Sequence, residues 1–283
     1  MTLPNFLVIG AAKSGTSSLH HYLRAHPQVF TPKLKEINFF DYDGTHLDVH
    51  YWAKTLEEYE RYFVDVGGAM AIGEVAPIYL CSRAAPENIS RLIPGTKLVV
   101  ILRNPVDRAY SAYLMSKRAG RTSVDLQSAF ATRSAGYIVR GRYATYLERY
   151  YERFDRQQIK VLRFEDLTKN ARSLTRELYQ FLGVDSGFEP PAEEVHNKGY
   201  VPRNEFLNRA VHSGFVRHVL KPMLPNGVMQ LARKLRSANA KRPPQLPMEI
   251  RAELATYYRD DILRLQELTR VDFSVWLSES NPS

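Results

Sequence analysis

Lysine, hydroxyl and glycine residues are concentrated near the N-terminus, in the segment from Gly10 to Ser18. The apolar run before it, residues 6–9, predicts a short buried strand, and the spacing of the apolar residues 19, 22 and 23 predicts a helix after it. Backbone N–H groups at a helix N-terminus have no intrahelical partner, and the helix dipole favours an anion there. The segment therefore predicts a binding loop for a phosphate-like oxyanion.

The nucleoside triphosphatase loop, G-x-x-x-x-G-K-[ST], has the same glycine spacing as Gly10 and Gly15. In that loop a lysine follows the second glycine and the next hydroxyl binds Mg²⁺. Here Thr16 follows Gly15, and the lysine comes earlier, at position 13. The order of residues weakens a kinase interpretation. The later apolar run 97–102 is followed directly by Arg103, which suits a phosphate better than a cation.

Strand and helix patterns alternate along the first two thirds of the chain, which predicts a parallel sheet with crossover helices. The expected strands are 6–10, 71–74, 97–102 and 159–164. The first expected helix runs through residues 19, 22 and 23 to about 26. The other expected helices are 56–64, 84–93, 105–117, 143–154, 170–182 and 248–268, with an irregular helical region at 203–236. The prediction is an α/β fold.

Size and charge narrow the function classes. The chain has 283 residues, enough for one large α/β domain, and its net charge of +9 favours an anionic partner. It contains no spacing typical of a nucleic-acid-binding motif, so no nucleic-acid partner is expected. Cys81 is the only cysteine, which excludes an internal disulfide. No apolar run approaches a membrane span, and we expect a cytoplasmic protein.

Three segments resemble motifs of the sulfotransferases that use 3′-phosphoadenosine 5′-phosphosulfate (PAPS). The loop 13–18 resembles their donor loop, 102–111 resembles their 3′-phosphate motif, and 35–40 resembles the segment that carries the base in the heparan-sulfate branch. Residues 141–149 and 197–200 also look like that branch.

The resemblance implies a P-loop-like three-layer α/β fold, with a central parallel β-sheet flanked by helices. It implies one sulfotransferase domain over 1–283, in which 184–245 would be a variable, mostly helical and loop region that shapes the acceptor site and covers the cofactor.

The resemblance also implies roles for residues that bind PAPS and its product, adenosine 3′,5′-bisphosphate (PAP), without a metal. Lys13 would contact the 5′-phosphosulfate and stabilise the leaving phosphate. The rest of the loop would hold the same group through Ser14, Gly15, Thr16, Ser17 and Ser18. The remaining donor contacts would be Arg103 and Ser111 on the 3′-phosphate, Tyr200 near the adenine, and Lys241 or Arg242 in a closing loop.

An acceptor hydroxyl must lose its proton, so the site needs a general base. Glu36 is the first candidate by resemblance, and Glu74, which follows a short apolar run, is the second; His46 and His50 are more distant options. The acceptor is expected to be a carbohydrate, a glycolipid or another small molecule with a hydroxyl or an amine. The alternatives are a P-loop kinase and a nucleotide-binding module without catalytic activity.

Overall fold

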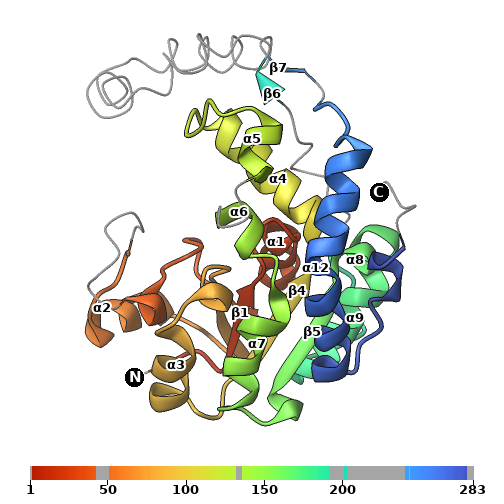
Figure 1. The fold of residues 1–283 in the computed structure, drawn as a ribbon. Helices are drawn as coiled ribbons and strands as arrows, with labels where there is room; N and C mark the ends of the chain where they lie inside the picture. Colours follow the sequence, from red (N-terminus) through yellow and green to blue (C-terminus); the bar gives the residue numbers. More distant parts are fainter. Residues whose placement is uncertain are drawn as a thin grey trace, which may run out of the picture. The chain divides into compact units, whose positions relative to one another are not determined.

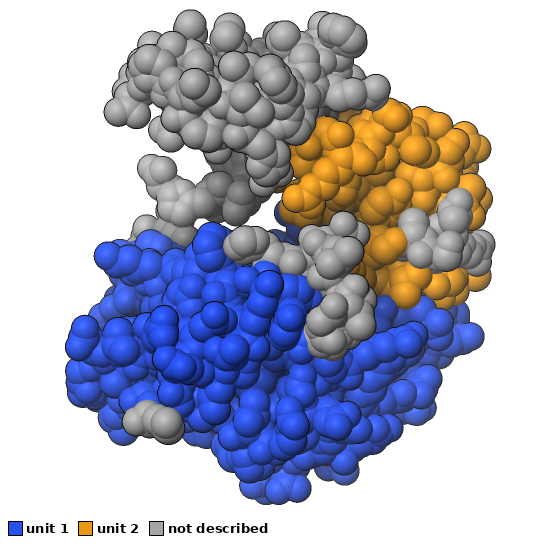
Figure 2. Space-filling view, turned by 90° about the vertical axis from the view of Figure 1, so that its left-hand side faces the viewer, with its two compact units in different colours: residues 1–105, 142–194, 258–283 blue, residues 106–141, 195–257 orange. Residues whose placement is uncertain are grey.

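The computed structural model describes residues 2–42, 51–131, 136–191, 201–202, 240–241 and 243–278, the two short pairs by their backbone alone. The chain forms two compact units, coloured separately in Figure 2. Unit 1 contains residues 1–105, 142–194 and 258–283, and unit 2 contains residues 106–141 and 195–257. Within the described residues, no helix is both long enough and apolar enough to cross a membrane.

Unit 1 is built on a five-stranded sheet in the order β2-β3-β1-β4-β5, in which all neighbours are parallel. The strands are β1 Phe6–Gly10, β2 Val29–Phe30, β3 Ala71–Val75, β4 Lys97–Leu102 and β5 Ile159–Arg163. The central strands β1 and β4 are almost completely buried, as their continuous apolar sequences predict for a sheet covered on both faces. All four expected strands are confirmed.

Helices cover both faces of this sheet, and the P-loop-like α/β fold is confirmed. The helices of unit 1 are α1 Thr16–Ala25, α2 Leu56–Glu60, α3 Ala85–Leu92, α7 Tyr143–Tyr151, α8 Phe164–Lys169 and α9 Ala171–Leu182. The apolar sides of α1, α8 and α9 share one core with β1 and β4. Figure 1 shows α3 and α7 on the opposite face. Short 3-10 turns are η1 Phe39–Asp41, η2 Arg61–Phe63, η3 Tyr79–Cys81, η4 Arg156–Gln158 and η7 Ser274–Trp276.

Unit 2 contains most of α4 Pro105–Arg118, with α5 Leu126–Ala131, α6 Gly136–Val139, the first part of α12 Met248–Thr269, and the antiparallel pair β6 Val201–Pro202 and β7 Ala240–Lys241. A buried arginine, Arg108, donates from α4 to the carbonyl of Tyr137, and Arg251 pairs with Asp107 at 2.5 Å. The expected helical region 203–236 lies outside the described residues. The single domain over 1–283 stays a prediction.

The order of the strands determines where a ligand can bind. After β1 the chain builds β2 and β3 on one side of that strand, and it then places β4 and β5 on the other side. In open α/β sheets, ligands bind at the carboxyl ends of the strands where the direction of winding reverses. Here that point lies between β1 and β4. The loops that follow these two strands carry Lys13 and Arg103.

Candidate active site

The loop between β1 and α1 has a backbone that only certain residues tolerate. Gly15 is the N-cap of α1 and has a φ of 87°. A Cβ atom on Gly15 would lie 2.8 Å from Leu167 and 2.9 Å from Phe164, so α8 packs directly against the loop. Lys13 also has a positive φ, 74°. Non-glycine residues in this region are strained, and such strain is concentrated at functional sites.

Hydroxyl groups of the same loop are arranged for an oxyanion. The Ser14 side chain is completely buried, and its Oγ atom has no hydrogen-bond partner within the described part of the chain. Thr16 and Ser17 are the first two residues of α1, where the backbone N–H groups are also without intrahelical partners. A buried hydroxyl without a partner costs free energy unless a ligand satisfies it. The loop therefore fits a phosphate or phosphosulfate group.

Arg103 follows β4, and its position is determined by contacts within unit 1. Its guanidinium lies 4.9 Å from the centre of the Phe164 ring, the same ring that packs close to Gly15. The Tyr143 hydroxyl donates to the Arg103 carbonyl at 2.9 Å. Among the described residues, no carboxylate forms an ion pair with Arg103, so its five N–H donors suit a phosphate. Ser111 lies half-buried on α4 in unit 2.

Glu36 is linked to the loop by the side chain of the preceding residue, Lys35. The Lys35 ammonium donates to Thr16 Oγ1 at 3.1 Å and to Ser17 Oγ at 3.2 Å, and it lies 3.5 Å from Glu36 Oε1. The Glu36 side chain is 52% exposed, whereas that of Lys35 is 19% exposed. Glu36 has a φ of 65°, and its N–H donates to the carbonyl of Val75 at the end of β3. An accessible carboxylate therefore stands beside the oxyanion loop.

Glu74 is buried beneath this turn and is 1% exposed. Its Oε1 accepts from the N–H of Asn38 at 3.1 Å, and its Oε2 accepts from the hydroxyls of Tyr59 at 2.8 Å and Tyr79 at 2.9 Å. Burial raises its pKa, and these hydrogen bonds partly offset the effect. With both oxygens occupied and no access to solvent, Glu74 is poorly placed to act as a base. Its contacts instead hold the turn that carries Glu36.

The raised pKa of Glu74 predicts a pH dependence of stability. Because the folded state favours the protonated acid, the stabilisation is complete below the unfolded-state pKa of about 4.3 and is lost as pH rises through the higher folded-state pKa. The glutamine in Glu74→Gln cannot ionise, so this variant should lose the part of the pH dependence of the melting temperature that Glu74 causes. Calorimetric melting from acidic to neutral pH measures it, with Glu87→Gln, exposed on α3, as the control. Parallel curves for wild type and Glu74→Gln would contradict the assignment.

Among the described histidines, His20 has a strongly shifted pKa. His20 lies on α1 with Nε2 3.1 Å from the carbonyl of Pro32. Burial lowers its pKa to about 4, so near neutral pH the uncharged ring donates this hydrogen bond. Such a weakly basic group is a poor proton acceptor. His46 and His50 lie outside the described residues.

The residues expected around the adenine and in the closing loop are less completely described. Tyr200 and Arg242 lie outside the described residues, and Lys241 is described by its backbone alone. The backbone pairs Val201 with Lys241. These three assignments stay predictions.

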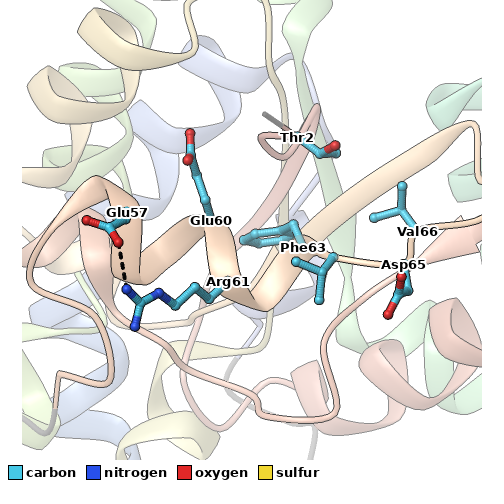
Figure 3. Close-up of a pocket in the computed structure, with 8 residues that line it drawn as sticks. Thr2, Glu57, Glu60, Arg61, Phe63, Asp65 and Val66 are labelled. Carbon is cyan, nitrogen blue, oxygen red and sulfur yellow. Dashed lines mark hydrogen bonds and ion pairs between the residues drawn. The ribbon is translucent and has the colours of Figure 1, made fainter.

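An open pocket of about 410 Å³ lies elsewhere in unit 1, and none of the candidate residues lines it. Figure 3 shows its lining residues and the ion pair between Arg61 and Glu57 at 2.6 Å. The lining consists of Thr2, Glu57, Glu60, Arg61, Phe63, Val64, Asp65 and Val66. Three carboxylates and one cation would repel a polyanionic nucleotide, so this pocket is not a candidate for the donor site.

Comparisons with known proteins indicate the family of the chain. The family model described as "Sulfotransferase domain" matches residues 3–199. The mouse protein named "Bifunctional heparan sulfate N-deacetylase/N-sulfotransferase 4" is 27% identical over 287 aligned positions, which cover 94% of this chain and 30% of the relative. The human protein named "Bifunctional heparan sulfate N-deacetylase/N-sulfotransferase 3" is 26% identical, and this match also covers 94% of this chain and 30% of the relative. The chain thus spans less than a third of the length of these curated relatives.

Solved structures give the same result. The "Crystal Structure of Sulfotransferase from Alicyclobacillus acidocaldarius" matches with a TM-score of 0.75 and 26% identity, and it covers 98% of this chain and all of that one. The "Sulfotransferase Domain from the Curacin Biosynthetic Pathway" matches with a TM-score of 0.50 at 15% identity, covering 86% of this chain and all of that one. The second match supports the fold alone.

Proposed function

Because this chain belongs to the sulfotransferase family, we propose that it transfers a sulfuryl group from PAPS to a hydroxyl or an amine of an acceptor and releases PAP. The observation that carries this proposal is the loop after β1. It combines the open N-terminus of α1 with the buried Ser14 hydroxyl, which has no hydrogen-bond partner among the described residues, and the Glu36 carboxylate lies beside it.

The donor would be held at both of its phosphate positions. We assign the 5′-phosphosulfate to Lys13 and to the loop from Ser14 to Ser18, where backbone donors and hydroxyls gather. Arg103, which forms no ion pair within the part of the chain that the structure describes, would bind the 3′-phosphate with its guanidinium fork. Ser111, Tyr200 and Lys241 or Arg242 complete the proposed set on the resemblance of their motifs.

Bound PAPS would supply the sulfuryl group, and its S–O bond to the 5′-phosphate breaks as a new bond forms from sulfur to the acceptor oxygen or nitrogen. Glu36 would take the proton that the acceptor loses, because its carboxylate is accessible and adjacent to the loop. Lys13 and the N–H groups of the loop would stabilise the negative charge that develops on the leaving phosphate. In this scheme the protein's own donors stabilise that charge, and no metal takes part.

A carbohydrate acceptor is favoured by the names of the relatives, and an exposed aromatic residue whose backbone bonds to the residue after Glu36 supports it. Trp52 is 48% exposed, and its backbone N–H donates to the carbonyl of Ile37 at 3.1 Å, one residue from Glu36. An exposed indole offers a flat apolar face with a polar N–H at its edge, which suits a sugar ring. We propose that Trp52 contacts the acceptor.

Transfer of ³⁵S from labelled PAPS tests the proposed function. The acceptor probes are a de-N-sulfated heparan oligosaccharide, which presents amines, an unsulfated heparosan oligosaccharide, which presents hydroxyls and acetylated amines, and p-nitrophenol as a non-carbohydrate. Label in either oligosaccharide above that in p-nitrophenol would support a carbohydrate acceptor. Label in p-nitrophenol alone would overturn the acceptor class, and no PAP formed from PAPS with any probe would overturn the proposed activity.

Arg103→Ala is expected to weaken binding of PAP about 10- to 100-fold while binding of adenosine 5′-monophosphate changes little. The reason is that only PAP carries the 3′-phosphate that would accept charge-assisted hydrogen bonds from the guanidinium. Titration calorimetry with both nucleotides measures the two affinities. Arg91→Ala, at an exposed position on α3, is the matched control. Equal weakening of both nucleotides would show that Arg103 does not contact the 3′-phosphate.

A further inference from the structure

The sequence alone assigned no role to Lys35, yet its ammonium contacts both the proposed donor loop and the proposed base. Its three N–H donors are directed toward three groups: Thr16 Oγ1, Ser17 Oγ and Glu36 Oε1. The first two belong to the proposed donor loop, and the third is the proposed base.

This position has a consequence for in-line transfer. The acceptor atom, the sulfur and the bridging oxygen of the donor must lie roughly on one line. The phosphate end of that line lies at the hydroxyls of Thr16 and Ser17, and the acceptor end lies at Glu36. A cation that contacts both ends must lie beside the group that moves between them.

We propose that Lys35 is a second catalytic cation, which binds the oxygens of the phosphosulfate during transfer and orients the Glu36 carboxylate toward the acceptor. This inference rests on the proposed function. In the transfer step Lys35 keeps its protons. The S–O bond to the 5′-phosphate breaks, the bond from sulfur to the acceptor forms, the acceptor proton goes to Glu36, and the negative charge leaves with PAP.

The local electrostatics favour this role over a structural one. The N-terminus of α1 carries the positive end of the helix dipole, where a cation is unfavourable. Burial of the Lys35 side chain also opposes its charge and lowers its pKa, and pairing with Glu36 offsets only part of this. A bound anion on the loop would relieve both effects. The ion pair with the exposed Glu36 carboxylate alone stabilises the charged Lys35 side chain only slightly, because solvent screens such pairs.

The test compares Lys35→Met and Lys35→Arg with Lys33→Met, a matched control at an exposed lysine two residues away. Single-turnover transfer is measured at saturating PAPS with the de-N-sulfated heparan oligosaccharide, and the acceptor-free hydrolysis of PAPS to PAP and sulfate is measured alongside. We expect Lys35→Met to be about 100-fold slower in each reaction that wild type performs. Lys35→Arg should recover at least part of the rate, and Lys33→Met should match wild type.

A double variant separates the two parts of the role. If Lys35 orients Glu36, Lys35→Met combined with Glu36→Gln should lose less than the product of the two single losses. Multiplicative losses would overturn the orienting role. A wild-type rate for Lys35→Met at saturating PAPS, or a lowered melting temperature with an unchanged rate, would overturn the catalytic role while leaving the proposed function intact. A wild type that forms no PAP from PAPS would overturn both.

Discussion

Lys13→Ala should lower the rate of sulfuryl transfer about 10²- to 10³-fold, the range found when one preorganised donor is removed from a developing anion. Lys13 lies in the loop between β1 and α1, where the departing phosphate would carry its new charge. The change should appear in kcat at saturating PAPS, because the charge grows only as the S–O bond breaks. Rapid-quench measurement of PAP formation gives this rate.

The same variant should remain folded. Lys13 has a φ of 74°, which is unfavourable for lysine and alanine alike, so the substitution adds little backbone strain. Circular dichroism melting checks this point, and Lys33→Ala serves as the control for loss of a lysine. Turnover near that of wild type would exclude Lys13 from the transfer step.

Glu36→Gln should slow transfer by about 10²- to 10⁴-fold and leave the affinity for PAP within about threefold of wild type. Glutamine preserves the size of the side chain and its contact with Lys35, but it cannot accept the acceptor proton. Single-turnover kinetics and PAP calorimetry on the same sample separate the two effects. Glu57→Gln, at an exposed carboxylate on α2, is the control. Loss of PAP binding with an unchanged transfer rate would assign Glu36 a structural role.

The parts of the fold that follow from local sequence were predictable. The strand at 97–102 is buried on both faces, so its continuous apolar run identified it. The helix after it begins at Pro105, which suits the first helical position. In contrast, β2 has only two residues and no pattern of its own. The final residue of the expected strand 159–164, Phe164, begins α8 instead, where Arg163 pairs with Asp166.

The site was less predictable because its contacts join distant segments. The spacing of residues cannot show that Lys35 reaches Thr16, since that contact depends on how the segment folds back over α1. The orientation of Glu74 was also hidden: a carboxylate after an apolar run is compatible with an open strand end or with burial, and the structure places it in the core. Similarly, the Asp261 side chain accepts from the N–H of Ala144 at the start of α7, although 117 positions separate them.

The most direct test of the donor assignment is calorimetric titration of the wild-type protein with PAP and, in parallel, with ATP and Mg²⁺. We expect micromolar binding of PAP and no comparable binding of Mg-ATP, because the loop departs from the triphosphatase pattern and Arg103 follows β4 where a kinase needs a carboxylate for Mg²⁺. A preference for Mg-ATP would contradict the sulfotransferase mechanism and favour a kinase.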